Sequence, residues 1–277
     1  MINVSETMRD DLRENGAIKI EGLFDSSRLA ECKRCFDYSL SNPGPTALDI
    51  FDGTSDSHYN DLGTHKTLEV YRPMLEKLAL GELLANLWGS ENIWYFGEEI
   101  FIKDGGAVGR SPWHQDTAYI PANGRHMANV WFSFEALPAR NALEVIKGSH
   151  LATQYDGAAY DDPNDPTKPM WGSDNFPQLP DIEAERRDDP NSWTVLSWDL
   201  EPGDALVLHS GALHGGAPVD AMCPTRHTLV LRFFGDDIYY RPFPKTKPDY
   251  FMDVREFDDG SMQAGEHYRS AHFLQLL

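Results

Sequence analysis

Five short segments rich in β-branched and aromatic residues dominate the sequence after position 92, and Gly, Pro, Asn and Asp separate them. The segments are IWYFGEEIFIK (93–103), MANVWFSFEAL (127–137), NALEVI (141–146), DALVLH (204–209) and HTLVLRFFGDD (227–237). Such runs are typical of strands, and no long helical segments alternate with them, as a parallel sheet would require. The pattern therefore predicts a mainly β fold in which antiparallel strands form a barrel or jelly roll.

The N-terminal third is expected to supply helices that flank this β structure. Residues 16–24 alternate as a short strand does, and capping residues then introduce an amphipathic helix over about 27–39. Leucines at helical spacing predict a second helix over about 73–88. Cys32 and Cys35 form a C-x-x-C pair, which can carry redox or zinc chemistry. Because neither a βαβ context nor a second ligand pair accompanies it, we expect two ordinary helix cysteines.

Length and charge limit the classes of partner. A chain of 277 residues with 41% hydrophobic composition is long enough for a sizeable core, and we expect a single domain over 1–277. The formal net charge of −20 repels phosphate backbones and anionic membranes, so nucleic acid is a poor partner. The charged N-terminal segment does not resemble a signal peptide, and three cysteines indicate a reducing compartment. We therefore expect a cytoplasmic protein without a membrane partner that acts on a small molecule, and the oligomeric state stays open.

The stretch 148–198 is full of Pro, Asp and Asn. Long insertions of this kind in compact domains are functional lids or disordered segments. Trp171, Phe176 and Trp193 favour an ordered lid over about 151–197, because aromatic side chains can pack against the part of the protein that the lid covers.

The motif WHQD (113–116) carries the first sign of metal-binding chemistry. Residues i and i+2 of a strand point to the same face, so His114 and Asp116 would project together while Gln115 points away. An imidazole and a carboxylate on one face form a two-ligand clamp.

A second histidine completes a metal-binding set. LHGG (213–216) follows a predicted strand, and the two glycines behind His214 let the backbone approach a crowded centre. Two imidazoles and one carboxylate are the facial triad of non-haem Fe(II) oxygenases, which keep three coordination positions open. His209 competes with His214 for this role, and we assign it to a structural hydrogen bond or to one that supports a metal ligand.

The segment TRHTLVLRF (225–233) places Arg226, Thr228, Val230 and Arg232 on one face of a strand. The Arg226 guanidinium could bind a carboxylate through two parallel hydrogen bonds, as a metal-bound 2-oxoacid dianion would require. Arg232 lies further along the same face and would instead read an anionic group of the substrate.

The candidates for the substrate cavity are Glu99, Lys103, Tyr119, Trp171 and Arg232. Glu99 and Lys103 share one strand face, and a salt bridge at the cavity rim is the alternative reading for this pair. Trp171, with Trp193, Tyr239 and Tyr240, could enclose a hydrophobic or cationic substrate, or else belong to the core. Asn141 and His150 are expected to fix loops.

An ordered set of motifs resembles the phytanoyl-CoA dioxygenase family across most of the chain. The motifs are WHQD…Y (113–119), ALEVIKGSH (142–150), PGDALVLH (202–209), LHGG (213–216) and RFFGDD (232–237). The resemblance implies a double-stranded β-helix, a cupin-like jelly roll, that uses Fe(II) with 2-oxoglutarate and O₂ as co-substrates. The family's functional positions then fall on the iron ligands His114, Asp116 and His214, the 2-oxoglutarate arginine Arg226, and the co-substrate contact Trp131.

Two departures from the family pattern bear on the substrate. Gly216 stands where some relatives have Ser, which removes one hydroxyl available to 2-oxoglutarate. A chain with this net charge also has little reason to recruit the phosphates of coenzyme A unless a local basic pocket overrides the field. The family name therefore does not identify the substrate.

The expected function is hydroxylation of a C–H bond in a small organic substrate, with release of succinate and CO₂. Desaturation, ring expansion and epoxidation would use the same ligands. The alternative is a non-redox cupin-like metal protein that binds or isomerises a ligand, and Arg226 argues against it because such a protein has no need of a carboxylate clamp. A sensor with a decayed site is disfavoured because every expected ligand is present.

Overall fold

The computed structural model describes residues 3–49, 57–159, 165–172, 176–243, 262–270 and 273–277. Within these ranges the helices are α1 (Glu6–Asn15), α2 (Ser26–Ser41), α3 (His65–Leu78), α4 (Leu80–Trp88) and α5 (Ile182–Asp188). No helix in these ranges is long and apolar enough to cross a membrane.

The larger sheet is antiparallel and has the order β1-β10-β7-β12-β4-β3-β2, with β14 beside β4. Its strands are β1 (Ala17–Ile20), β2 (Leu48–Asp49), β3 (Ser57–Leu62), β4 (Trp94–Asp104), β7 (Met127–Ser133), β10 (Ala205–Leu208), β12 (Arg226–Phe234) and β14 (Leu274–Gln275). β12 lies between β7 and β4, and its register sets Val230 beside Trp131 on one side and Glu99 on the other. Residues far apart in the sequence thus share one face.

The smaller sheet is also antiparallel and has the order β5-β11-β8-β9. Its strands are β5 (Ser111–His114), β8 (Leu143–Ile146), β9 (Val195–Leu196) and β11 (His214–Gly216). A separate pair joins β6 (Ala122–Asn123) to β13 (Tyr239–Tyr240). The prediction of a mainly β fold with flanking helices is confirmed.

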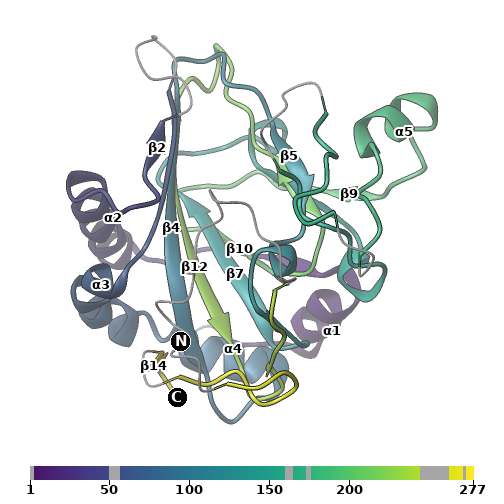
Figure 1. Cartoon of the computed structure of the whole chain (residues 1–277). Helices are drawn as coiled ribbons and strands as arrows, with labels where there is room; N and C mark the ends of the chain where they lie inside the picture. The colour runs from purple at the N-terminus through teal and green to yellow at the C-terminus, as the bar shows by residue number, and fades with distance from the viewer. Residues whose placement is uncertain (1–2, 50–56, 160–164, 173–175, 244–261, 271–272) are drawn as a thin grey trace.

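Strand alternation divides the core into two layers. On β12, Leu229 and Leu231 belong to the core cluster that includes residues of α2, α3 and α4. Val230 points the other way and packs in a second cluster with Trp131 and with Val145 of the smaller sheet. Figure 1 shows the same arrangement, with α2 and α3 on one side of β4 and with β5 and β9 on the other. The even-numbered residues of β12 therefore face the space between the two sheets.

The helix predicted over 27–39 is present as α2, and Cys32 and Cys35 are free and buried in it. Burial raises the pKa of the Cys32 thiol well above its usual value and that of Cys35 to about 11. Both thiols are therefore protonated and poorly reactive at neutral pH.

The prediction of a single helix over 73–88 is wrong in two respects. The helical region begins earlier, and it is divided into α3 and α4. α3 begins at His65 behind a Thr64 cap, and Pro73 lies inside it rather than at its first turn. Ala79 adopts a left-handed conformation with φ of 55°, which ends α3 and starts α4. Leucine spacing alone does not reveal such a break, since Ala is the best helix former and rarely adopts positive φ.

The insertion predicted over 151–197 contains regular structure that its composition does not indicate. α5 lies within it, and β9 at its end pairs with β8 through Leu196 opposite Val145. An isolated bridge joins Ala158 to Pro169. Residues 160–164 and 173–175 of this segment lie outside the described residues.

Candidate metal centre

The predicted clamp forms, but not on a single strand. β5 ends at His114, Gln115 continues with extended backbone (φ −119°, ψ 125°), and Asp116 begins a short 3₁₀ turn, Asp116–Ala118. Gln115 points away as expected: its amide nitrogen donates to the Gly211 carbonyl at 2.8 Å. The extended Gln115 preserves the i, i+2 relation, so the strand can end without separating the two side chains.

β11 brings His214 directly beside the clamp. Its Cα is paired with that of His114 in the antiparallel ladder between β11 and β5. A Cβ on Gly215 would lie 2.9 Å from the Pro112 and Ser111 carbonyl oxygens, so this position accepts only glycine without movement of the backbone. The expectation that a glycine permits close approach behind His214 agrees with this geometry.

Gly216 has a physical reason to differ from the serine of some relatives. It adopts φ of 79°, and a Cβ there would lie 2.8 Å from a carboxylate oxygen of Glu144. Arg110 holds that carboxylate in an ion pair. The conformation and the neighbouring charge pair together favour glycine at this position.

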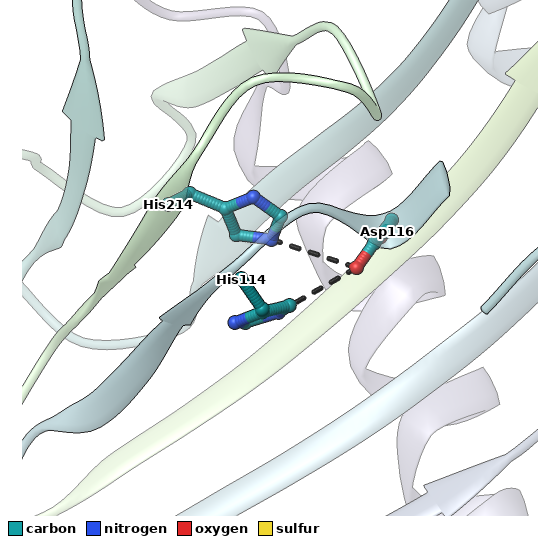
Figure 2. A group of neighbouring side chains, drawn as sticks. All are labelled: His114, Asp116 and His214. Carbon is teal, nitrogen blue, oxygen red and sulfur yellow. Dashed lines mark ion pairs between the residues drawn. The ribbon is translucent and has the colours of Figure 1, made fainter. Parts of the chain in front are cut away.

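The three predicted ligands converge on one point (Figure 2). Asp116 Oδ1 lies 3.5 Å from His114 Nε2 and 3.6 Å from His214 Nε2. One possible ligand atom from each residue lies within 4.8 Å of the others. Adjacent ligands about 2.1 Å from a metal stand roughly 3 Å apart, so a small contraction around an ion would complete the arrangement.

Backbone carbonyls set the tautomers of both imidazoles. His114 Nδ1 lies 2.9 Å from the Pro112 oxygen, and His214 Nδ1 lies 2.8 Å from the Ala212 oxygen. Because a carbonyl only accepts, each Nδ1 carries a hydrogen, and Nε2 is the ring atom of each histidine that is available to a metal ion. Both rings are thus oriented as metal ligands.

The protonation states also suit a metal. Burial, together with the neighbouring His114, lowers the pKa of His214 to about 4, so this imidazole is neutral at pH 7. Burial opposes ionisation of Asp116, but Arg232 and the two histidines hold its pKa below the usual range. A neutral imidazole and an ionised carboxylate are the forms that bind metal ions.

Arg232 and Glu99 pair with each other beside a predicted metal ligand. Arg232 Nε donates to Asp116 Oδ2 at 3.2 Å, and its NH2 group donates to Glu99. Asn129 Nδ2 donates to the same Asp116 oxygen at 2.7 Å. The side chains of Arg232 and Glu99 are only 11% and 10% exposed, so Glu99 pairs inside the protein with Arg232 rather than with Lys103 at a rim. Arg232 contacts a predicted metal ligand, a role that its place on the strand face alone did not reveal.

Arg226 is buried and has an unsatisfied donor. Its NH1 group donates to the Ala217 carbonyl at 2.9 Å, and its guanidinium carbon lies 5.7 Å from the Trp131 ring centre. Among the described residues, Arg226 Nε and Thr228 Oγ1 are buried without a hydrogen-bond partner. Buried polar atoms without partners are rare in folded proteins, so such atoms indicate a site for a bound group.

Lys103 is a second basic side chain beside Arg226. It is opposite Arg226 in the ladder between β4 and β12, and its Nζ donates to the Gly109 carbonyl at 2.7 Å and to Ser111 Oγ at 3.1 Å. No carboxylate pairs with it within the described residues. Burial, together with Arg226, lowers the pKa of Lys103 to about 6. The sequence suggested Lys103 for the substrate, and the structure places it beside the predicted co-substrate arginine.

Tyr119 and Trp171 link the insertion to the turn that carries Asp116. The Tyr119 ring meets His114 edge-on at 6.2 Å, and its hydroxyl accepts from the Ala158 amide at 2.8 Å. Trp171 is buried, and its Nε1 donates to the Ala118 carbonyl at 3.0 Å. Both predicted substrate residues therefore lie close to the trio.

The other aromatic candidates are Trp193, Tyr239 and Tyr240, and their contacts are with residues other than the three predicted ligands. Trp193 Nε1 donates to Glu185 of α5 at 2.7 Å. Tyr239 is exposed on β13, and the Tyr240 ring stacks on Tyr268 with centres 6.1 Å apart.

His209 has structural partners, as assigned from the sequence. Its Nδ1 accepts from the Gly211 amide at 2.9 Å, its Nε2 lies 3.1 Å from the Gly124 oxygen, and its ring packs on His150. His150 Nε2 in turn contacts the Arg13 oxygen. Asn141 Nδ2 donates to the Pro218 carbonyl at 3.1 Å.

The sequence matches the model of the family described as Phytanoyl-CoA dioxygenase over residues 12–227. The chain belongs to this family. With that membership it falls in the class of Fe(II)- and 2-oxoglutarate-dependent enzymes, as the resemblance implied. A comparison of the sequence with curated proteins gives no match.

Several solved structures share the fold. The epimerase SnoN, in complex with Fe³⁺, alpha ketoglutarate and nogalamycin RO, has a TM-score of 0.68 and 15% identity, with 98% of both chains covered. The alpha ketoglutarate dependent carbocyclase SnoK has a TM-score of 0.70 and 14% identity, with 99% of this chain and 97% of that chain covered. EvdO2 from Micromonospora carbonacea var. aurantiaca, complexed with 2-oxoglutarate, has a TM-score of 0.60 and 16% identity over 91% of this chain and 98% of that chain. The fold is therefore the cupin-like jelly roll of these enzymes.

Proposed function

We propose that this chain is an oxygenase that binds Fe(II) through His114, Asp116 and His214 and hydroxylates a small organic substrate at a C–H bond. The convergence of two imidazole nitrogens and an ionised carboxylate on one point carries the proposal. This donor set is the facial triad of non-haem iron oxygenases. In the balanced reaction, substrate, 2-oxoglutarate and O₂ give hydroxylated substrate, succinate and CO₂.

Iron supplies the oxygen activation, and the chain supplies position and charge. The Pro112 and Ala212 carbonyls keep both histidine Nε2 atoms directed at the metal position. The Asp116 carboxylate offsets one of the two positive charges of the ion. Three coordination positions remain for co-substrate and O₂.

We propose that Arg226 binds the far carboxylate of 2-oxoglutarate, with Lys103 beside it and Trp131 against the carbon chain. The unpartnered Arg226 Nε and Thr228 Oγ1 fit a carboxylate, which accepts several hydrogen bonds. Two buried basic side chains, Arg226 and Lys103, pair with no carboxylate among the described residues, and this favours an anionic ligand. The SnoN and EvdO2 structures, which contain alpha ketoglutarate and 2-oxoglutarate, support this choice of co-substrate.

Hydroxylation is tested against other outcomes by product analysis. Asp116 occupies the position that halide-transferring relatives leave to a small residue, so chloride has no equivalent vacancy here. With Fe(II), 2-oxoglutarate, O₂, excess chloride and a substrate that stimulates succinate release, the product is expected to gain one oxygen atom by mass. A product that loses two hydrogens would contradict hydroxylation, and so would an epimerised or cyclised product of the kind that the epimerase SnoN and the carbocyclase SnoK are described as making. Each of these outcomes would still agree with the proposed iron site. A halogenated main product would contradict the role of Asp116.

We also propose that residues 151–197 act as a lid within a single domain. Glu183 of α5 accepts hydrogen bonds from Arg110 NH1 at 2.5 Å and Trp113 Nε1 at 2.7 Å. Trp113 directly precedes His114, and the Arg110 guanidinium lies 4.7 Å from its ring centre. The insertion is thus attached to the strand that ends in a metal ligand.

The Glu183→Ala variant is expected to loosen this attachment. Amide hydrogens of α5 should exchange roughly tenfold faster, because hydrogen bonds to charged groups contribute about 1.5–3 kcal/mol and this carboxylate is partly exposed. Mass spectrometry of deuterium exchange measures the change. The matched control is Glu185→Ala, which removes a carboxylate from the same helix and frees only Trp193. Equal protection in the wild type and in Glu183→Ala would contradict the attachment.

A further inference from the structure

The two oxygens of Asp116 have separate sets of partners. Oδ1 faces the Nε2 atoms of His114 and His214. Oδ2 accepts hydrogen bonds from Asn129 Nδ2 and from Arg232 Nε. Ser210 Oγ donates to Asn129 Oδ1 at 3.1 Å and orients this amide. One oxygen is therefore directed toward the metal position, while two fixed donors hold the other.

The donors on Oδ2 come from neighbouring strands of the larger sheet. Arg232 on β12 is directly opposite Asn129 on β7 in the ladder. Glu99 on β4 is opposite Val230, two residues along the same face, and accepts from the Arg232 NH2 group. All of these side chains project into the space between the sheets. The sheet register thus builds a rigid cradle behind the Asp116 carboxylate.

Glu99 is the partner of Arg232 in this cradle, and their side chains are only 10% and 11% exposed. The directed hydrogen bond from Arg232 Nε fixes where Asp116 Oδ2 lies. The pair therefore acts on the geometry of the carboxylate as well as on the local charge.

The geometry of a carboxylate matters at a crowded metal. A carboxylate binds through one or both of its oxygens. Binding through both would occupy one of the three positions that the facial triad leaves open. A 2-oxoacid chelate needs two of these positions, and O₂ needs the third. Free rotation of Asp116 would therefore compete with the co-substrates.

We propose that Arg232 is a positioning residue that holds Asp116 Oδ2, so that the carboxylate binds iron through Oδ1 alone, and that Glu99 holds Arg232 in place. The inference rests on the proposed function, since it takes the trio as iron ligands. It assigns to Arg232 and Glu99 a task in the metal site rather than in substrate recognition.

The experiment separates positioning from a purely structural ion pair. The Arg232→Met variant leaves the Glu99 carboxylate buried without its partner, so the Tm of this variant is expected to fall below that of the wild type. The double variant Arg232→Met/Glu99→Gln removes both charges and is expected to recover most of the lost Tm. Fe(II) affinity and the visible band of the anaerobic Fe(II)–2-oxoglutarate complex are then measured for each variant below its Tm. The control Arg269→Met removes another arginine in partly buried contacts, those with Asp236 and Trp94.

Positioning predicts that Fe(II) affinity falls roughly 10–100-fold in both Arg232 variants, as loss of an outer-shell partner does, and that the band shifts or weakens. The double variant should regain stability without regaining the band, and Arg269→Met should keep the wild-type band. If Fe(II) affinity and band return with Tm in the double variant, the pair is only structural and the inference is wrong. If neither Arg232→Met nor the double variant folds, Arg232→Lys is used instead, because it keeps the positive charge. An ammonium lacks the guanidinium fork, so the band of Arg232→Lys should also shift or weaken. A wild-type band in that variant would overturn the proposal, whereas absence of the band in the wild type would instead contradict the proposed function.

Discussion

Asp116→Ala is expected to abolish Fe(II)-dependent succinate formation, and His114→Ala and His214→Ala should do the same. Each substitution removes one of the three ligand atoms that converge within 4.8 Å. The loss of Fe(II) affinity should exceed the roughly 10–100-fold effect of losing an outer-shell partner, because the metal bond itself is removed. Asp116→Ala also removes the charge that offsets the ion. Fe(II) titration and a succinate assay measure the two effects.

His209→Ala is the matched control for the histidine substitutions. His209 is half-buried, but its ring nitrogens contact the Gly211 amide and the Gly124 oxygen. This variant should retain measurable activity and bind Fe(II), although its stability should fall because the Gly211 amide loses its acceptor. Loss of Fe(II) binding in His209→Ala, with retention in His214→Ala, would reverse the ligand assignment.

Arg226→Ala is expected to raise the 2-oxoglutarate concentration needed for half-maximal activity roughly a hundredfold. A charge-assisted contact of this kind contributes on the order of 2–3 kcal/mol, and about 1.4 kcal/mol corresponds to a factor of ten. The site is buried, so solvent does not replace the lost donors. Steady-state kinetics with varied 2-oxoglutarate measure the change.

Lys103→Met provides the comparison for Arg226→Ala. With a pKa lowered to about 6, Lys103 is a neutral amine at pH 7 until an anion enters, so its loss should weaken 2-oxoglutarate binding less than loss of Arg226. Fe(II) affinity in the absence of 2-oxoglutarate should stay near that of the wild type in both variants. Equal 2-oxoglutarate affinity in the wild type and in Arg226→Ala would contradict the co-substrate pocket.

Local sequence patterns could predict the strands and the order of the ligands. Period-2 alternation correctly sets Thr228 and Val230 on the face opposite Leu229, because every second side chain of a strand shares a face. The glycines after His214 indicated a close approach that steric contacts at Gly215 explain. These features depend on residues within a few positions of one another, which a sequence displays directly.

Tertiary contacts account for what the patterns did not predict. Arg232 and Glu99 are 133 positions apart, and only the register of β12 against β4 shows that they pair. The break between α3 and α4 lies at Ala79, whose positive φ of 55° is not what the high helix propensity of alanine predicts. The 3₁₀ turn at Asp116 is closed by backbone hydrogen bonds from Ala118 and Tyr119, which no side-chain spacing encodes.

Anaerobic titration of the wild-type protein with Fe(II) and 2-oxoglutarate tests the iron and co-substrate site most directly. A 2-oxoacid chelated to Fe(II) absorbs visible light by charge transfer, so we expect a band that saturates at one Fe(II) per chain. The band should be absent in His214→Ala and should need roughly a hundredfold more 2-oxoglutarate in Arg226→Ala. A folded wild-type protein that binds Fe(II) without this band, or a band that persists in His214→Ala, would contradict the proposed iron and co-substrate site.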